Sequence, residues 1–267
     1  MRRQAPQAAR SAIRSAARWR AGCASAALAL ALATAPVAHG QGFVGRGTVV
    51  GGDAAAQIVD SANHTDVLIH QDQVVIDWSP SDLSGNGAIN FLPNGNSATY
   101  QSRGLAGFTV LNRIVPYDPA SGAVLNRAIA LNGLIQSRVD NAVGGNVWFY
   151  SPGGILVGST GVFDVGGLVL TSNAIDVTNG LYGGNGEIRF RGASGSLSAV
   201  SVARGANIKA LATGSYVALV APRVEMSGTV NVNGSAAYVG AEQADVRINN
   251  GLFDIAMTVG TGDAHGV

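Results

Sequence analysis

Short apolar runs, instead of the stripes of an amphipathic helix, follow one another along the chain after residue 41. Each run is rich in β-branched or aromatic residues, and Gly, Asn, Asp and Ser separate the runs. Examples are residues 74–76, 88–91, 108–111, 147–150 and 229–232. Almost no segment shows the 3.6-residue period of a helix. Short runs bounded by turn residues are typical of strands, so the pattern predicts an all-β protein.

One strand–turn–strand unit is written twice near the end of the chain. Residues 207–210 (NIKA) precede residues 216–219 (YVAL), and residues 229–232 (TVNV) precede residues 237–240 (AYVG). Ile208 and Val230 are 22 positions apart, as are Val217 and Val239. Such a period predicts stacked coils, each of which buries its apolar face only against its neighbours. We expect a right-handed parallel β-helix (β-solenoid), with an antiparallel sandwich or barrel as the structural alternative.

The first coil of such a stack would expose unpaired strand edges. Natural proteins cover or blunt edges of this kind, because they pair readily with other chains. We therefore expect an N-terminal β cap within residues 42–80.

The first forty residues have the composition of a targeting segment. They contain six arginines and no acidic residue, and an apolar stretch over residues 24–35 is followed by Pro36 and small residues up to Gly40. This order predicts a secretory signal peptide over residues 1–40. The apolar stretch is too short to span a bilayer as a stable helix. Cys23 is the single cysteine, so removal of the signal leaves a mature chain without disulfides or thiolate chemistry.

Removing the signal changes the charge balance. The chain has 17 basic and 16 acidic residues, and residues 41–267 retain 11 basic and 16 acidic ones, a net charge of −5. Lys209 is the only lysine. An anionic body with few cations argues against a nucleic-acid partner, and a phosphate-binding P-loop is excluded because its lysine must follow a glycine-rich turn. The sequence predicts no cofactor.

Several runs occur in an order that matches a known family. Residues 75–78 (VIDW) come first, residues 87–91 (GAINF) second, and residues 110–114 (VLNRI) third, with an Asn–Arg pair after an apolar run. Residues 130–135 (ALNGLI), 145–158 (GNVWFYSPGGILVG) and 163–172 (FDVGGLVLTS) complete the series. In this order, residues 74–179 resemble the N-terminal secretion domain of the filamentous haemagglutinin family. These proteins are the large exported partners of bacterial two-partner secretion systems.

The most specific part of the resemblance is a turn between two strands. The family's Asn-Pro-Asn-Gly-Ile turn is similar to Ser151-Pro152-Gly153-Gly154-Ile155 here, with both asparagines replaced, and the family's second motif, Asn-Pro-Asn-Leu, is absent. Proline fixes φ and the two glycines permit positive φ, so local chemistry also predicts a tight turn.

The resemblance implies a recognition role for particular residues. Asn112, Arg113 and residues 151–155 would help an outer-membrane transporter recognise the chain. The alternative is structural, with Asn112 stabilising a turn, Arg113 a surface cation and residues 151–155 a corner of the stack. Trp148 and Phe149 are neighbours on one predicted strand, so we expect one inside and the other available outside.

The resemblance also implies a domain organisation and partners. Residues 1–40 would be the signal peptide, residues 41–180 the secretion domain with its cap, and residues 181–267 further coils. The chain would then be either a fragment of a longer exoprotein or an unusually short exoprotein. The protein would be an adhesin- or haemagglutinin-like exoprotein that reaches the cell surface or medium through the periplasm and outer membrane. Its implied partners are the transporter's periplasmic POTRA domains, and surface glycans or receptors.

Two alternatives stay open. A contact-dependent toxin of the same secretion class would carry its effector beyond Val267. A β-helical polysaccharide-degrading enzyme could recruit acids and arginines, namely Arg138, Asp140, Asp164, Asp176 and Arg189, but they are dispersed in the sequence. A metal site from His64, Asp66, His70 and Asp72 on one strand face is disfavoured, because Leu68 interrupts that face. We expect no enzyme and no metal centre.

Overall fold

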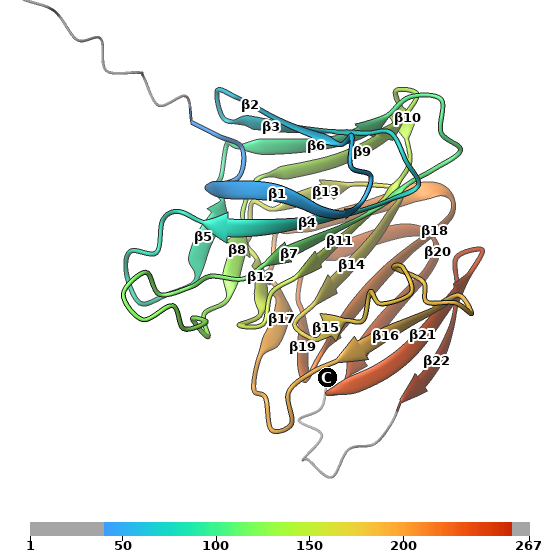
Figure 1. Cartoon of the computed structure of the whole chain (residues 1–267). Coiled ribbons are helices and arrows are strands. Elements are labelled where there is room, and N and C mark those ends of the chain that lie inside the picture. The colour runs from blue at the N-terminus through green and yellow to red at the C-terminus, as the bar shows by residue number, and fades with distance from the viewer. Residues whose placement is uncertain (1–39, 258–267) are drawn as a thin grey trace, which may run out of the picture. The chain divides into compact units, whose positions relative to one another are not determined.

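The computed structural model describes residues 40–257, and every regular element in that part of the chain is a β-strand (Figure 1). The prediction of an all-β protein is confirmed. Most strands belong to three stacks of parallel neighbours, which successive coils visit in the same order. The predicted signal peptide lies outside the described residues apart from Gly40. The predicted boundary at residues 180 and 181 falls between two strands, and the division stays a prediction.

Each stack draws one strand from each coil. The first contains β3 (His64–Ile69), β6 (Ser97–Ser102), β9 (Leu134–Val139), β13 (Val162–Asp164) and the first halves of β18 (Asn207–Ala221) and β20 (Thr229–Gly240). The second contains β4 (Gln73–Pro80), β7 (Thr109–Ile114), β11 (Asn146–Tyr150), β14 (Gly167–Thr171) and the second halves of β18 and β20. The third contains β5 (Ile89–Leu92), β8 (Ile129–Leu131), β12 (Ile155–Val157), β17 (Ala199–Val202) and β19 (Arg223–Met226).

The largest sheet is mixed in direction. Since β18 and β20 bend from the first stack into the second, these two stacks form one sheet, which has 13 strands once three antiparallel additions are counted, and the third stack is a separate 5-stranded parallel sheet. Antiparallel pairing enters at three places: β1 (Gly45–Gly52) on β4, β2 (Gln57–Ser61) on β3, and the short β10 (Ala142–Val143) on β9. Both β1 and β2 lie within the range in which the sequence predicts a cap.

Phe43 closes the N-terminal end of the interior beneath β1 and β2. Its ring centroid lies 4.9 Å from that of Phe91 and 4.8 Å from that of Trp78, and all three side chains are buried. Asp53, in the turn between β1 and β2, fixes this cap to the first coil. Its buried carboxylate accepts backbone N–H groups from Ala55, His70 and Gln71 at 3.0, 2.5 and 3.1 Å. The cap is therefore held by both packing and hydrogen bonds.

The predicted repeat is correct in its first half and wrong in its second. Ile208 pairs with Val230, at the expected spacing of 22 residues. Val217 pairs with Ala236 instead of Val239. The difference arises where the chain turns from the first stack to the second, because β18 uses residues 211–214 for this turn and β20 uses residue 233 alone. The coils thus keep register on each face while their corners vary in length.

A third sheet covers the outer face of the second stack (Figure 1). It consists of β15 (Ala174–Ile175), β16 (Glu187–Arg191), β21 (Gln243–Asn249) and β22 (Leu252–Met257), all antiparallel. We call these four strands the cover sheet. Ile188 and Phe190 of β16 pack with the outward-facing Leu111, Trp148 and Val169 in a buried cluster distinct from the interior of the coils.

The cover sheet changes the expected exposure of β11. Phe149 points into the interior and Trp148 points outward, as alternation requires, yet both side chains are 0% exposed. Trp148 lies under Tyr182, with ring centroids 5.2 Å apart, and its Nε1 donates a 2.9 Å hydrogen bond to the Tyr216 hydroxyl. The expectation that one of the two aromatics is available outside is therefore wrong, because local alternation does not reveal a second layer.

Candidate functional site

Asn112 lies inside the coils. Its Oδ1 accepts hydrogen bonds from Trp78 Nε1 at 2.9 Å and from the Tyr100 hydroxyl at 2.8 Å, and its Nδ2 donates to the Trp148 carbonyl at 3.1 Å. The side chain is fully buried, so these partners use the polar capacity that burial would otherwise leave unsatisfied. Asn112 therefore ties three successive coils together from within and presents nothing to the outside.

Arg113 points the opposite way, onto the outer face of the second stack. Its Nε and Nη2 donate to Asp77 Oδ1 and Oδ2 at 2.6 and 2.9 Å, a bidentate pair between neighbouring strands. The Arg113 side chain is 31% exposed. A partly exposed ion pair of this kind contributes modestly to stability, on the order of 1 kcal/mol or less.

Residues 151–154 form the tight turn that the sequence predicts. The Gly154 N–H donates to the Ser151 carbonyl at 3.0 Å, and Gly154 has a φ of +102°. A Cβ on Gly153 would lie within 2.5 Å of the backbone N and C atoms of Arg127, and one on Gly154 would lie 2.5 Å from the Ala199 carbonyl oxygen. Both glycines are thus required by close approach of the coils before and after the turn.

The predicted recognition residues divide by exposure. Asn112, Ser151, Gly154 and Ile155 are buried, and Ile155 belongs to the interior cluster. Arg113, Pro152 and Gly153 are partly exposed. The fold thus brings this second group to the outside of adjacent coils, and their part in recognition stays a prediction.

Two tyrosines that sequence reasoning did not single out stand near Arg113. Tyr150 pairs in register with Arg113, and burial raises its pKa against the opposing effect of the Arg113 charge. Tyr117 is half exposed in the loop between β7 and β8, where it forms a bridge with Val124. The segment Pro116-Tyr117-Asp118-Pro119 could have drawn attention to this loop, because it stands where the family's second motif is missing.

A hydrogen-bond network lies between the second stack and the loop before β16. The hydroxyls of Tyr182 and Thr109 are 2.7 Å apart, and Asn146 Nδ2 donates to Thr109 Oγ1 at 3.0 Å. Gln73 Oε1 accepts the Leu181 N–H at 2.9 Å. These bonds satisfy the polar atoms that the cover sheet and its loop bury against the stack, so the network is part of the structure and not an open site.

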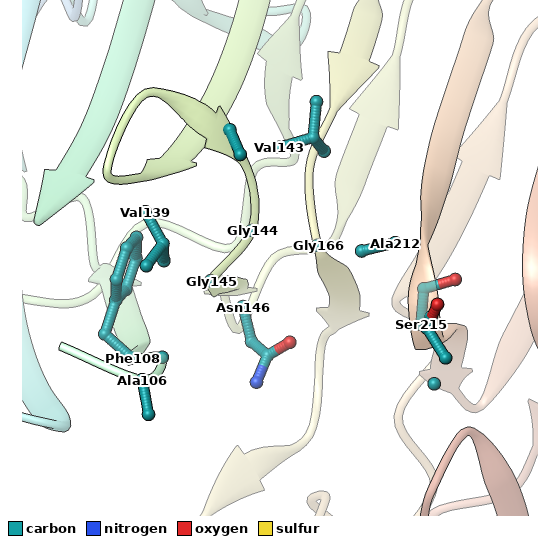
Figure 2. Close-up of a pocket in the computed structure, with 14 residues that line it drawn as sticks. Ala106, Phe108, Val139, Val143, Gly144, Gly145, Asn146, Gly166, Ala212 and Ser215 are labelled. Atoms are coloured by element: carbon teal, nitrogen blue, oxygen red, sulfur yellow. The ribbon is translucent and has the colours of Figure 1, made fainter.

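A groove runs along the corner between the first and second stacks (Figure 2). Its volume is about 420 Å³. It forms because the turn from the first to the second stack is short in the fourth coil, where it consists of Val165 and Gly166. The corresponding turns of the coils on either side are longer, at residues 140–145 and 211–214. Phe108, Val139 and Asn146 point toward it, and none of its lining residues is charged. The groove therefore offers no acid, base or cation for catalysis.

The residues of the enzyme alternative do not gather into one constellation. Arg138 Nη2 lies 2.5 Å from Asp164 Oδ2 on the first stack, and Asp140 Oδ1 accepts the Gly104 N–H at 2.8 Å. Asp176 and Arg189 are joined by a backbone hydrogen bond beside the cover sheet. Residues 40–257 hold no group of three or more His, Cys, Asp or Glu that could bind a metal ion.

Buried tyrosines predict a loss of stability in alkali. Burial raises the pKa values of Tyr100 and Tyr216 well above the usual 10.0. The unfolded chain releases these phenolic protons near pH 10 while the folded chain retains them, so the tyrosines' contribution to the free energy of unfolding is fully present below about pH 10 and is lost above it. Urea titrations at several pH values measure this slope. We expect Tyr216→Phe to reduce it and the exposed Tyr117→Phe to leave it unchanged; equal slopes in all three proteins would contradict the assignment.

The comparisons with known proteins rest on structure. No protein-family profile matches the chain, and no curated protein does. Solved structures share its fold. The chain is similar to the secretion domain of HMW1 from Haemophilus influenzae. The match has a TM-score of 0.60 and 18% sequence identity, and it covers 80% of this chain and 49% of the HMW1 chain. This chain thus spans about half the length of that domain, and at this identity the likeness establishes the fold alone. Within residues 40–257 we find no helix that would reach across a membrane.

Proposed function

We propose that this protein is the N-terminal, secretion-directing part of a two-partner secretion exoprotein. The observation that carries the proposal is the fold that residues 40–257 share with the HMW1 secretion domain, over 80% of the chain. The ordered motifs of residues 74–179 support it independently, because their sequence resembles that of a secretion domain of this class. The partner is an outer-membrane transporter with periplasmic POTRA domains. The signal peptide delivers the chain to the periplasm, and the mature protein acts outside the cell.

The three stacks wind, in this proposal, as a right-handed parallel β-helix. A strand that returns to a parallel neighbour through a crossover does so with right-handed chirality in about 98% of cases. Each coil here returns to a parallel neighbour of the same stack through such a crossover. The cap and the cover sheet are then additions to a continuous helix of coils.

The exposed members of the motif set are the proposed transporter contacts. Arg113 and Pro152 reach the outside of adjacent coils near Tyr150, and Tyr and Arg are among the residues that protein interfaces favour. Asn112, Ser151, Gly154 and Ile155 act indirectly, by holding these coils in register. The protein works by binding and not by catalysis, which the separate pairing of Asp164 and Asp140 favours. Adhesion to glycans or receptors, as in an adhesin or haemagglutinin, is the proposed role of the exported product.

Export from a Gram-negative host, with and without the cognate transporter, tests the proposal. We expect the chain in the medium only when the transporter is present. Arg113→Ala and Asp77→Ala form a matched pair, because each removes the same ion pair and only one removes the proposed contact. Arg113→Ala is expected to lower export several-fold, and Asp77→Ala to leave it near wild type while both lose the same small amount of stability. Transporter-independent release would reject the secretion role; equal export of the two variants would reject Arg113 as a contact.

A further inference from the structure

Seven asparagines of the chain are followed directly by a glycine. They are Asn86, Asn94, Asn132, Asn179, Asn185, Asn233 and Asn250. In such a pair the backbone nitrogen of the glycine can attack the side-chain carbonyl carbon of the asparagine, because glycine has no side chain to hinder the approach. A fold permits this reaction only where the asparagine side chain and the next N–H group are free to turn toward each other. The structure therefore separates seven similar sequences into protected and reactive ones.

Hydrogen bonds restrain four of the seven pairs directly. In three of them the asparagine amide is bound, since Nδ2 of Asn132, Asn185 and Asn233 donates hydrogen bonds of 2.9, 3.0 and 3.4 Å. In the fourth the attacking group is bound, since the Gly180 N–H donates to the Val177 carbonyl at 3.1 Å. Reaction at any of these pairs first requires a hydrogen bond to break.

Turn geometry restrains two further pairs. Asn250 lies in the two-residue turn between the paired strands β21 and β22, where its φ is 47° and that of Gly251 is 80°. Asn94 lies in a turn that the Asn96 N–H closes by a 3.1 Å hydrogen bond to the Pro93 carbonyl. In both turns the backbone between asparagine and glycine is fixed by its neighbours.

The pair Asn86-Gly87 has none of these restraints. It lies in the loop between β4 and β5, where residues 85–88 are all exposed. Within residues 40–257, neither the Asn86 side chain nor the Gly87 N–H makes a hydrogen bond, and no closed turn contains them. No atom lies within 4 Å of the position that a Cβ on Gly85 or Gly87 would take. The reacting atoms of this pair are therefore free to meet.

We propose that Asn86 is a site of spontaneous modification, at which the folded protein converts asparagine to aspartate and isoaspartate. The Gly87 nitrogen forms a bond to Asn86 Cγ, the bond from Cγ to Nδ2 breaks, and ammonia leaves with the former Gly87 amide proton. Water then opens the resulting succinimide ring. Opening at the side-chain carbonyl gives aspartate, and opening at the main-chain carbonyl gives isoaspartate, so water is the only co-reactant.

The isoaspartate product changes a loop that one arginine holds in place. Arg127 Nε and Nη1 donate to the Gly87 and Leu83 carbonyls, each at 2.8 Å. Isoaspartate routes the main chain through its side-chain carbon, which adds one backbone atom immediately before Gly87. The Arg127 backbone in turn packs closely against Gly153. The modification thus loosens a loop that is anchored beside the tight turn of residues 151–154.

Peptide mapping by mass spectrometry, after storage of the folded full chain in mildly alkaline buffer, tests the proposal. We expect Asn86 to convert about ten-fold faster than any of the other six asparagines, the ratio that a barrier difference of about 1.4 kcal/mol produces. Gly87→Ala is the matched variant, because it keeps Asn86 and its added methyl group meets no other atom. It should slow the conversion of Asn86 by hindering the attacking nitrogen and leave the other six unchanged.

The same chain stored in urea supplies the reference. There all seven pairs are unrestrained, and we expect them to convert at similar rates. A folded chain in which another asparagine converts before Asn86, or a preference for Asn86 that persists in urea, overturns the proposal.

Hydrogen exchange over residues 82–88 tests the structural consequence. It should accelerate in the isoaspartate product and stay near wild type in Asn86→Asp, which adds the charge without the extra backbone atom. Equal exchange in the two would contradict the loosening of the loop.

Discussion

Replacement of Asn112 by leucine is expected to destabilise the fold by about 4 kcal/mol. The substitution keeps a similar volume but leaves the Trp78 indole N–H, the Tyr100 hydroxyl and the Trp148 carbonyl buried without their partner. Each unsatisfied buried group costs about 1–3 kcal/mol. Urea unfolding followed by tryptophan fluorescence measures the loss.

Tyr100→Phe provides the graded control for this experiment. It removes one donor and leaves Asn112 bonded to Trp78, so the expected cost is about 1 kcal/mol. If Asn112→Leu costs no more than Tyr100→Phe, the asparagine is not the hub that the geometry describes. The comparison also separates two explanations for impaired export. If export falls in proportion to stability across both variants, the impairment is structural and does not reflect a lost contact with the transporter.

Replacement of Gly153 by alanine is the second substitution with a large expected effect, about 3 kcal/mol or more. The added methyl group would meet backbone atoms of Arg127 in the preceding coil, and backbone cannot rotate away as a side chain can. Separation of the two coils at this corner is the expected response. Thermal unfolding monitors it, with a lowered midpoint as the result.

Gly184→Ala is the matched control. Gly184 lies in the loop before β16, no atom lies within 4 Å of the position its Cβ would take, and its φ is not in the left-handed region. We expect a change in stability within about 0.5 kcal/mol. Comparable losses at the two glycines would show that the close approach at residue 153 is relieved at little cost.

The local features of the fold were accessible from sequence, and the long-range ones were not. Runs such as residues 147–150 and 229–232 fall within β11 and β20, since alternation and turn residues act over short distances. The same signal marks residues 187–190, yet β16 belongs to the cover sheet and not to a coil. Nothing local distinguishes a strand that stacks from one that lies on top, which is why the burial of Trp148 was predicted wrongly.

The candidate site shows the same division. The turn at residues 151–154 follows from proline and glycine chemistry, and the structure contains it. The inward direction of Asn112 depends on β7 alternation together with donors on Trp78, in the preceding coil, and on Tyr100, in another stack of the same coil. A single sequence does not specify that meeting. The pairing of Arg113 with Asp77 likewise depends on the register between β4 and β7.

The cover sheet imposes an order in time on a chain that emerges from its N-terminus. β16 pairs with β15 on one side and with β21 on the other, and the β21 partners, such as Val246 opposite Ile188, arrive more than fifty residues later. Until then, only half of the cover sheet is present over the outward-facing residues Leu111, Trp148 and Val169. The first four coils can thus assemble early while the outer face of their second stack remains apolar and partly uncovered. Residues 243–257 cover the rest of that face when they emerge. Trp148 reports an earlier step, since its surroundings change from water to Tyr182 and Tyr216, and both of these residues precede β21 in the chain.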